Sequence, residues 1–138
     1  MAGYSGTPLA RKLGIKDGHR IAVVGAPDGF DEAIGPLPEV DAGSRLRGSL
    51  DVVVFFANRR GVLERRFEAL KRALDPAGGL WIAWPKRSSG VRTDLTEDVV
   101  REIALANGLV DNKVCAIDGT WSGLRLVYRL ADRPKPAS

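Results

Sequence analysis

Basic side chains follow two apolar stretches that are typical of buried strands. Arg59 and Arg60 come directly after one stretch, and Lys86 and Arg87 come after another. Guanidinium and ammonium groups bind carboxylates and phosphates through charge-assisted hydrogen bonds. The carboxyl ends of parallel strands meet at one edge of a sheet, where ligands of open α/β sheets bind. The sequence therefore predicts an anion-binding patch at this edge, with an ordinary basic loop as the alternative.

Turn residues after the predicted strands complete the candidate site. Serines offer hydrogen bonds to an anion, and Trp121, in a predicted turn, either stacks on a ligand or seals the turn onto the core. Trp81 and Trp84 differ in parity within one strand, so we expect them on opposite faces, with Trp84 bordering the site. The candidate ligand-binding residues are Gly25, Asn58, Arg59, Trp84, Lys86, Arg87, Ser88, Ser89, Trp121 and Ser122.

Catalytic and metal-binding patterns are weak in this sequence. One histidine and one cysteine are too few good ligands for a zinc site. His19 precedes a strand at its amino end, so we expect it to serve a turn. Cys115 lies within a predicted strand, which indicates a buried, inert thiol. We predict no catalytic residue and no metal site.

The charge is unevenly distributed along the chain. The net charge is +4, but residues 42–92 hold eleven bases and four acids, whereas residues 93–111 hold five acids and one base. A basic band favours an anionic partner, although charge runs usually mark solvated faces. We therefore expect a small anionic ligand or a protein partner. Nucleic acid ranks lower, because no aromatic residues are interleaved with the bases.

Length and composition favour one cytoplasmic domain. The chain has 138 residues, of which 44% are hydrophobic. It shows no signal-peptide pattern and no apolar run of membrane-spanning length. The expected organisation is an N-terminal helix and turn over residues 1–19, an α/β core over 20–130 and a frayed tail over 131–138.

Short apolar runs alternate with amphipathic segments along the core. Strands are predicted at 20–24, 50–57 and 80–84, and two more at 113–117 and 124–130. The run 50–57 is apolar throughout, which is typical of a central parallel strand. A poor edge strand is possible at 37–40, and residues 75–79 and 118–123 are expected to be turns.

Helices are expected at 9–13, 60–74 and 96–107, and one helical turn after residue 30. Thr7 and Thr96 are suitable N-caps, and Gly108 suits a left-handed helix end. The fold class is therefore a three-layer α/β domain with a mostly parallel sheet and an antiparallel C-terminal edge hairpin.

This element order resembles the class I methyltransferase fold, which binds S-adenosylmethionine. The stretch 23–29 resembles its first strand and glycine-rich turn, and 51–55 resembles its central strand. The stretch 74–80, Leu-Asp-Pro-Ala-Gly-Gly-Leu, resembles its L-x-P-G-G-x-L turn. The whole chain also resembles a family of small, mainly actinobacterial proteins with no assigned activity, through residues 6–9, 12–15, 84–86 and 121–124.

Three departures from the methyltransferase pattern concern the cofactor. The glycine-rich turn carries Pro27 or Ala26 in place of its middle glycine, and proline removes a backbone donor. Only Glu39 and Asp41 are candidates for the acid that holds the ribose. The stretch 56–60 lacks the N/D-P-P-Y signature of amino-group methyltransferases. We therefore expect a degenerate, non-catalytic binding module without S-adenosylmethionine, and a minimal methyltransferase using that cofactor is the alternative.

Overall fold

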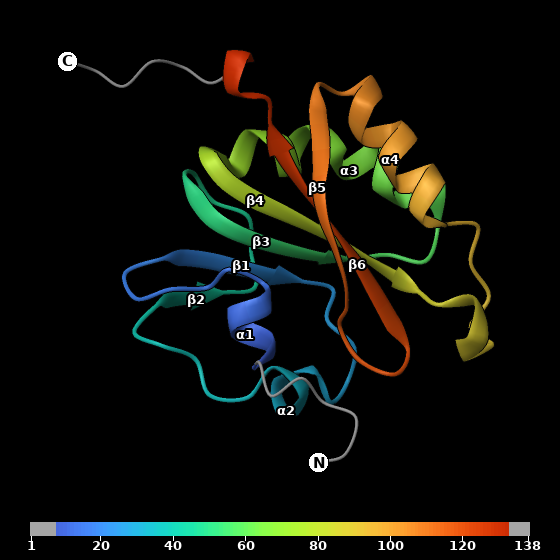
Figure 1. Cartoon of the computed structure of the whole chain (residues 1–138), viewed down its shortest axis with the longest axis horizontal. Helices are drawn as coiled ribbons and strands as arrows, with labels where there is room; N and C mark the ends of the chain where they lie inside the picture. The colour runs from blue at the N-terminus through green and yellow to red at the C-terminus, as the bar shows by residue number, and fades with distance from the viewer. Residues whose placement is uncertain (1–7, 133–138) are drawn as a thin grey trace.

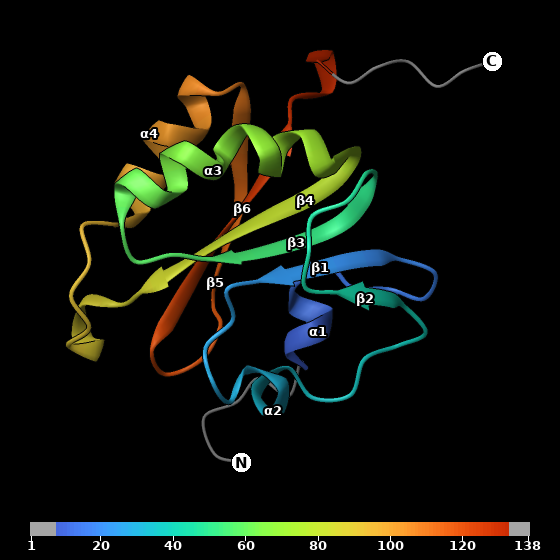
Figure 2. The ribbon, with the colours of Figure 1, turned by 180° about the vertical axis from the view of Figure 1, so that it is seen from behind.

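A six-stranded sheet with helices on both faces forms the part of the chain described by the computed structural model, residues 8–132 (Figures 1 and 2). The predicted cap Thr7 and residues 133–138 of the predicted tail lie outside the described residues. The strands are β1 Arg20–Val24, β2 Asp41–Gly43, β3 Leu50–Phe56, β4 Leu74–Pro85, β5 Leu109–Ala116 and β6 Trp121–Tyr128. The helices are α1 Leu9–Lys12, α2 Phe30–Ile34, α3 Arg60–Ala73 and α4 Glu97–Ala106, with 3-10 turns at Arg87–Ser89 and Leu130–Asp132.

The strand order β2-β1-β3-β4-β6-β5 confirms the predicted mixed sheet. β1 pairs in parallel with β2 and β3, and β3 pairs in parallel with β4. β6 runs antiparallel to both β4 and β5, so the last two strands form the antiparallel edge. The first strand therefore lies beside the buried central strand, and the loops that follow them meet at one end of the sheet.

One face of the sheet is covered by α3 and α4. Leu63, Phe67 and Leu70 recur at helical spacing along α3 and are fully buried against this face. The N–H of Val99 donates to Thr96 Oγ1 at 3.2 Å, which confirms the predicted cap of α4. Most of the helical side chains in the core therefore come from α3 and α4.

Among residues 8–132, the helices on the opposite face are α1 and α2, which have four and five residues. Trp81 points to this face and Trp84 to the other, as their parity predicts. The indole N–H of Trp81 donates to the carbonyl of Leu13 at 3.0 Å, which ties the end of α1 to β4. Such short helices cover only part of a sheet face.

Several predicted element boundaries are wrong. Residues 75–79 form an irregular section of β4, because Leu50 pairs with Leu74 while Val52 already pairs with Gly79. Residues 121–123 belong to β6, since they pair with 83–85 across the sheet. The edge strand lies at Asp41–Gly43 in place of 37–40. Among residues 8–132, no helix has the length and apolar character needed to span a membrane.

Candidate anion-binding site at the carboxyl end of the sheet

A cavity of about 560 Å³ lies where β4 and β6 meet the loop before α4. Trp84 pairs with Ser122 across these strands, so both side chains face the α4 side of the sheet. Trp84 and Leu95 are buried and form an apolar floor. Lys86, Arg87 and Arg92 supply its cationic side chains. The lining is Trp84–Arg87, Gly90–Thr93, Leu95–Glu97 and Ser122.

A second cavity of about 460 Å³ adjoins the first one. It is lined by Asn58, Arg59 and residues 91–94, so the segment 91–93 is a wall shared by both cavities. Six of the ten predicted residues therefore lie around one bipartite site. They are Asn58, Arg59, Trp84, Lys86, Arg87 and Ser122.

The shared wall is attached to the start of α3. The hydroxyl of Thr93 donates to the carbonyl of Asn58 at 2.8 Å and accepts from the N–H of Leu95 at 3.0 Å. The N–H of Arg60 donates to Asp94 Oδ1 at 2.6 Å, so a carboxylate from another segment caps α3. These bonds hold the wall over the carboxyl end of β3.

Four cations of this bipartite site differ from the other arginines nearby. Within the described chain, the charged groups of Arg59, Lys86, Arg87 and Arg92 make no ion pair and no hydrogen bond. Arg101, by contrast, binds three carboxylates. Its hydrogen bond to Glu97 is the main cause of its raised pKa. The positive charges of Arg59, Lys86, Arg87 and Arg92 are therefore not neutralised by residues 8–132.

Three predicted participants in the patch have other roles. Arg60 pairs with Glu64 of its own helix α3 at 3.2 Å and with Glu102 of α4 at 3.5 Å. The hydroxyl of Ser89 donates to the carbonyl of Lys86 at 2.6 Å, so it closes a turn and has no proton to offer a ligand. Ser88 lies in the same turn and lines neither cavity.

Gly25 and Trp121 lie on the other face of the sheet, away from the two cavities. The Phe56 ring makes edge-to-face contacts with two neighbours, with ring centroids 5.0 Å from Phe30 and 5.1 Å from Trp121. A Cβ at Gly25 would lie 3.1 Å from the backbone oxygen of Phe56. The space beside this glycine, which has φ +74°, is thus taken by the protein itself.

Neither acid proposed for the ribose stands at the carboxyl end of β2. Asp41 is the first residue of that strand, pairs with Arg20 in the sheet and forms a 3.1 Å ion pair with Arg47. Glu39 precedes the strand, and its N–H donates to Asp17. The residues that follow β2 are Ser44 and Arg45, so this position carries no carboxylate.

His19 lies in a turn, as the sequence indicates, whereas Cys115 is only partly buried and not the buried thiol that was predicted. Nδ1 of His19 accepts from the N–H of Lys16 at 3.2 Å, within the turn before β1. Cys115 is half-buried in β5, and burial raises the pKa of its thiol. Between residues 8 and 132, no three His, Cys, Asp or Glu side chains are grouped to hold a metal.

Sequence reasoning missed the segment that divides the two cavities. Val91, Arg92 and Thr93 lie in a polar loop between a predicted strand and a predicted helix, and nothing in their types marks a site. The available signal was Arg92, the last base of the basic band. Only the fold shows that this loop turns back onto Asn58.

No protein-family model and no curated protein sequence matches this chain. Its solved structural neighbours include a SAM-dependent methyltransferase from Aquifex aeolicus, with 16% identity, TM-score 0.61 and coverage of 86% of both chains. A putative type 11 methyltransferase from Sulfolobus solfataricus has 13% identity and TM-score 0.60, with 94% of this chain and 95% of that chain covered.

Magnesium protoporphyrin IX methyltransferase from Synechocystis PCC 6803, solved with bound SAH, has 13% identity and TM-score 0.58. The match covers 87% of this chain and 78% of that chain. The chain thus has the fold of S-adenosylmethionine-dependent methyltransferases. At this level of identity the likeness defines the fold alone.

Proposed function

We propose that this protein is a non-catalytic binding protein whose ligand is a small organic anion. The observation that carries the proposal is the gathering of Arg59, Lys86, Arg87 and Arg92 on two neighbouring cavities that share a wall, with no partner for their charges between residues 8 and 132. Unpaired cations in a concave site favour carboxylate or phosphate groups. The buried floor formed by Trp84 suits an apolar part of the same ligand.

S-adenosylmethionine does not fit the residues at the fold's usual cofactor position. The turn after β1 is closed by Phe56 against Gly25, and the edge-on contacts of Phe30 and Trp121 with Phe56 fill the adjacent space. The carboxyl end of β2 offers Arg45 where the fold uses an acid for the ribose. We also propose that the chain belongs to the family of small, mainly actinobacterial proteins. That family has no assigned activity.

Phenyl phosphate is a suitable probe, because it joins one aromatic ring to one phosphate. We expect a two-dimensional amide NMR titration to shift the signals of residues 91–95 and the indole N–H of Trp84. The Lys86→Ala/Arg87→Ala double variant should bind at least about tenfold more weakly, because charge-assisted hydrogen bonds are lost. Arg72→Ala, an exposed arginine paired with Glu68 on α3, is the matched control. Equal affinity in both variants would remove the proposal.

The second candidate function is a minimal methyltransferase, which the solved neighbours favour through their shared fold. It requires S-adenosylmethionine to enter beside Gly25. Equilibrium dialysis with radiolabelled cofactor distinguishes the two candidates. Retention of label by the native protein and its loss in Gly25→Val would support the methyltransferase, whereas no retention supports the binding protein.

A further inference from the structure

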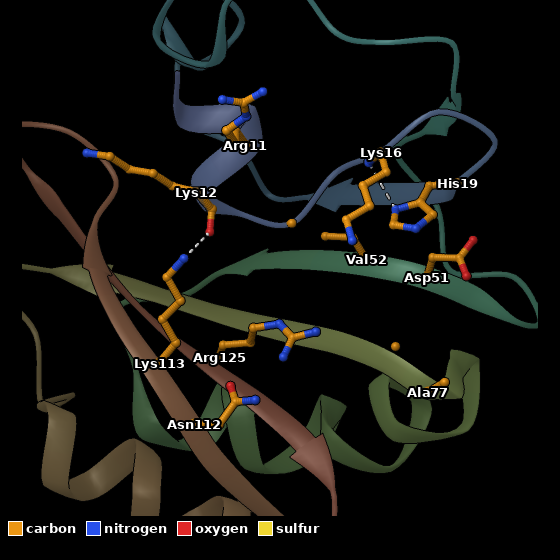
Figure 3. Close-up of a pocket in the computed structure, with 12 residues that line it drawn as sticks. Arg11, Lys12, Lys16, His19, Asp51, Val52, Ala77, Asn112, Lys113 and Arg125 are labelled. Carbon is orange, nitrogen blue, oxygen red and sulfur yellow. Dashed lines mark hydrogen bonds between the residues drawn. The ribbon is translucent and has the colours of Figure 1, made fainter. Parts of the chain in front are cut away.

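A third cavity, of about 390 Å³, lies at the opposite end of the sheet and is shown in close-up in Figure 3. It opens on the face that carries α1, beside the amino-terminal part of β3 at Asp51 and Val52 and the irregular section of β4 at Ala77 and Gly78. The cavity exists because α1 and α2 are too short to cover this part of the sheet. It shares no residue with the two cavities at the carboxyl end.

Most of the charged side chains that line this cavity are basic. Arg11, Lys12 and Lys16 come from α1 and the following turn, and Lys113 and Arg125 come from β5 and β6. Asp51 is the acid in the lining, and its Oδ2 accepts from the N–H of Arg20 at 2.8 Å. Three segments that are far apart in sequence therefore bring an excess of positive charge to one hollow.

The two basic groups from the strands are held in place. Nζ of Lys113 donates to the carbonyl of Lys12 at 2.9 Å, which links β5 to α1 across the cavity. The guanidinium of Arg125 lies directly over Gly79, because a Cβ at that position would lie 2.7 Å from its Cζ. Gly79 thus leaves the space that the guanidinium of Arg125 occupies against the sheet.

The chemistry of the lining indicates phosphoryl groups. Its side chains are mainly charged or polar and include no phenylalanine, tyrosine or tryptophan on which a ring stacks. Arginine suits the bidentate recognition of phosphate oxygens, and lysine binds phosphate as a point charge. Cations on two sides of the hollow fit a ligand with more than one anionic group, because a single phosphate engages one side.

We propose that this cavity is a binding site for a diphosphate group, either free or as part of a nucleoside diphosphate. The α1 side, with Arg11 and Lys16, holds one phosphoryl group, and Lys113 with Arg125 holds the other. This inference does not depend on the proposed function, since the two sites have different residues and lie at different ends of the sheet.

Calorimetric titration at low salt with inorganic pyrophosphate, ADP and orthophosphate tests the proposal. We expect pyrophosphate to bind, and to bind at least about tenfold more weakly in Lys113→Ala and in Arg11→Ala. Tighter binding of ADP supports a nucleotide as the source, and equal binding supports free diphosphate. Affinity should fall as salt increases.

Arg72→Ala, which removes an exposed arginine of α3 that lines none of the three cavities, is the matched control, and its affinity for pyrophosphate should be unchanged. Lys113 and Arg11 are both exposed, and circular dichroism verifies that each variant folds. Gly79→Ala should displace Arg125 and weaken binding, with circular dichroism to verify folding. The proposal is overturned by no heat with pyrophosphate, by orthophosphate binding as tightly, or by a loss confined to the Lys86→Ala/Arg87→Ala variant.

Discussion

The two faces of the sheet are built differently. On one face α3 and α4, with fourteen and ten residues, cover the strands with aliphatic and aromatic side chains. On the other face α1 and α2 provide four and five residues, so the sheet is covered by an aromatic cluster at one end and left hollow and basic at the other. The contrast shows that the sheet keeps a packed core although one of its two helical layers is short.

The largest expected effect is a loss of stability on the face that α3 and α4 cover. Phe67→Ala removes a fully buried ring from the α3 face and should lower the free energy of unfolding by about 4 kcal/mol, because it leaves a cavity in the packed layer. Urea unfolding measures the loss. Leu105→Ala, on the exposed side of α4, is the control and should cost less than about 0.5 kcal/mol. Similar losses for both variants would contradict the contrast.

On the face that carries α1 and α2, the buried hydrogen bond from Trp81 is one of the contacts that position α1. Trp81→Phe keeps an aromatic ring but removes the donor to Leu13, so it should cost about 2 kcal/mol. We expect faster amide hydrogen exchange at Leu13 and Ile15 and unchanged exchange in α3. If exchange increases equally on both faces, the indole does not act as a local anchor.

Asp94 caps α3 beside the candidate site, on the sheet face that α3 and α4 cover. Asp94→Ala removes the acceptor of the Arg60 N–H and should cost about 1 kcal/mol in urea unfolding. Asp94→Asn keeps a side-chain oxygen and should retain most of that stability. Equal losses in the two variants would show that the carboxylate charge, and not the hydrogen bond, stabilises the helix.

The smallest effect concerns pH and the edge strand β5. Burial raises the pKa of the Cys115 thiol, so the unfolded chain loses this proton at lower pH than the folded one. The contribution to stability is fully present below the ordinary thiol pKa of about 8.5 and is lost as pH rises through the folded pKa. The free energy of unfolding of the native protein should therefore fall more steeply above that pH than that of the Cys115→Ser variant. Parallel pH profiles would refute this.

The sequence predicted the elements whose signals are local. The apolar run 50–57 and the stripe of Leu63 and Phe67 define β3 and α3, because burial on two faces and on one stripe leaves clear periodicity. The breaker residues 75–79 misled, since pairing with β3 overrides the turn preference of Pro76 and Gly78. Strand β6 was predicted to begin too late, because residues 121–123 have a turn-like sequence but pair with β4.

The candidate sites were harder to predict than the fold. The basic groups after β3 and β4 could be found because they follow adjacent strands. Gly25 and Trp121 also follow predicted strands. The alternation of side chains along β6, however, directs Trp121 to the opposite face of the sheet. The amino-end cavity combines Arg11 with Lys113 and Arg125, and their proximity depends on the register of strands far apart in the chain.

We propose that Phe56, with the Phe30 and Trp121 rings packed against it, takes up the space beside Gly25 where S-adenosylmethionine would enter. The direct test is a titration of the isotopically labelled native protein with S-adenosylhomocysteine, followed through the amide of Gly25 and the indole N–H of Trp121. We expect both signals to stay unchanged at a large molar excess. Saturable shifts of both signals would show that the cofactor enters beside Phe56, and they would contradict the claim.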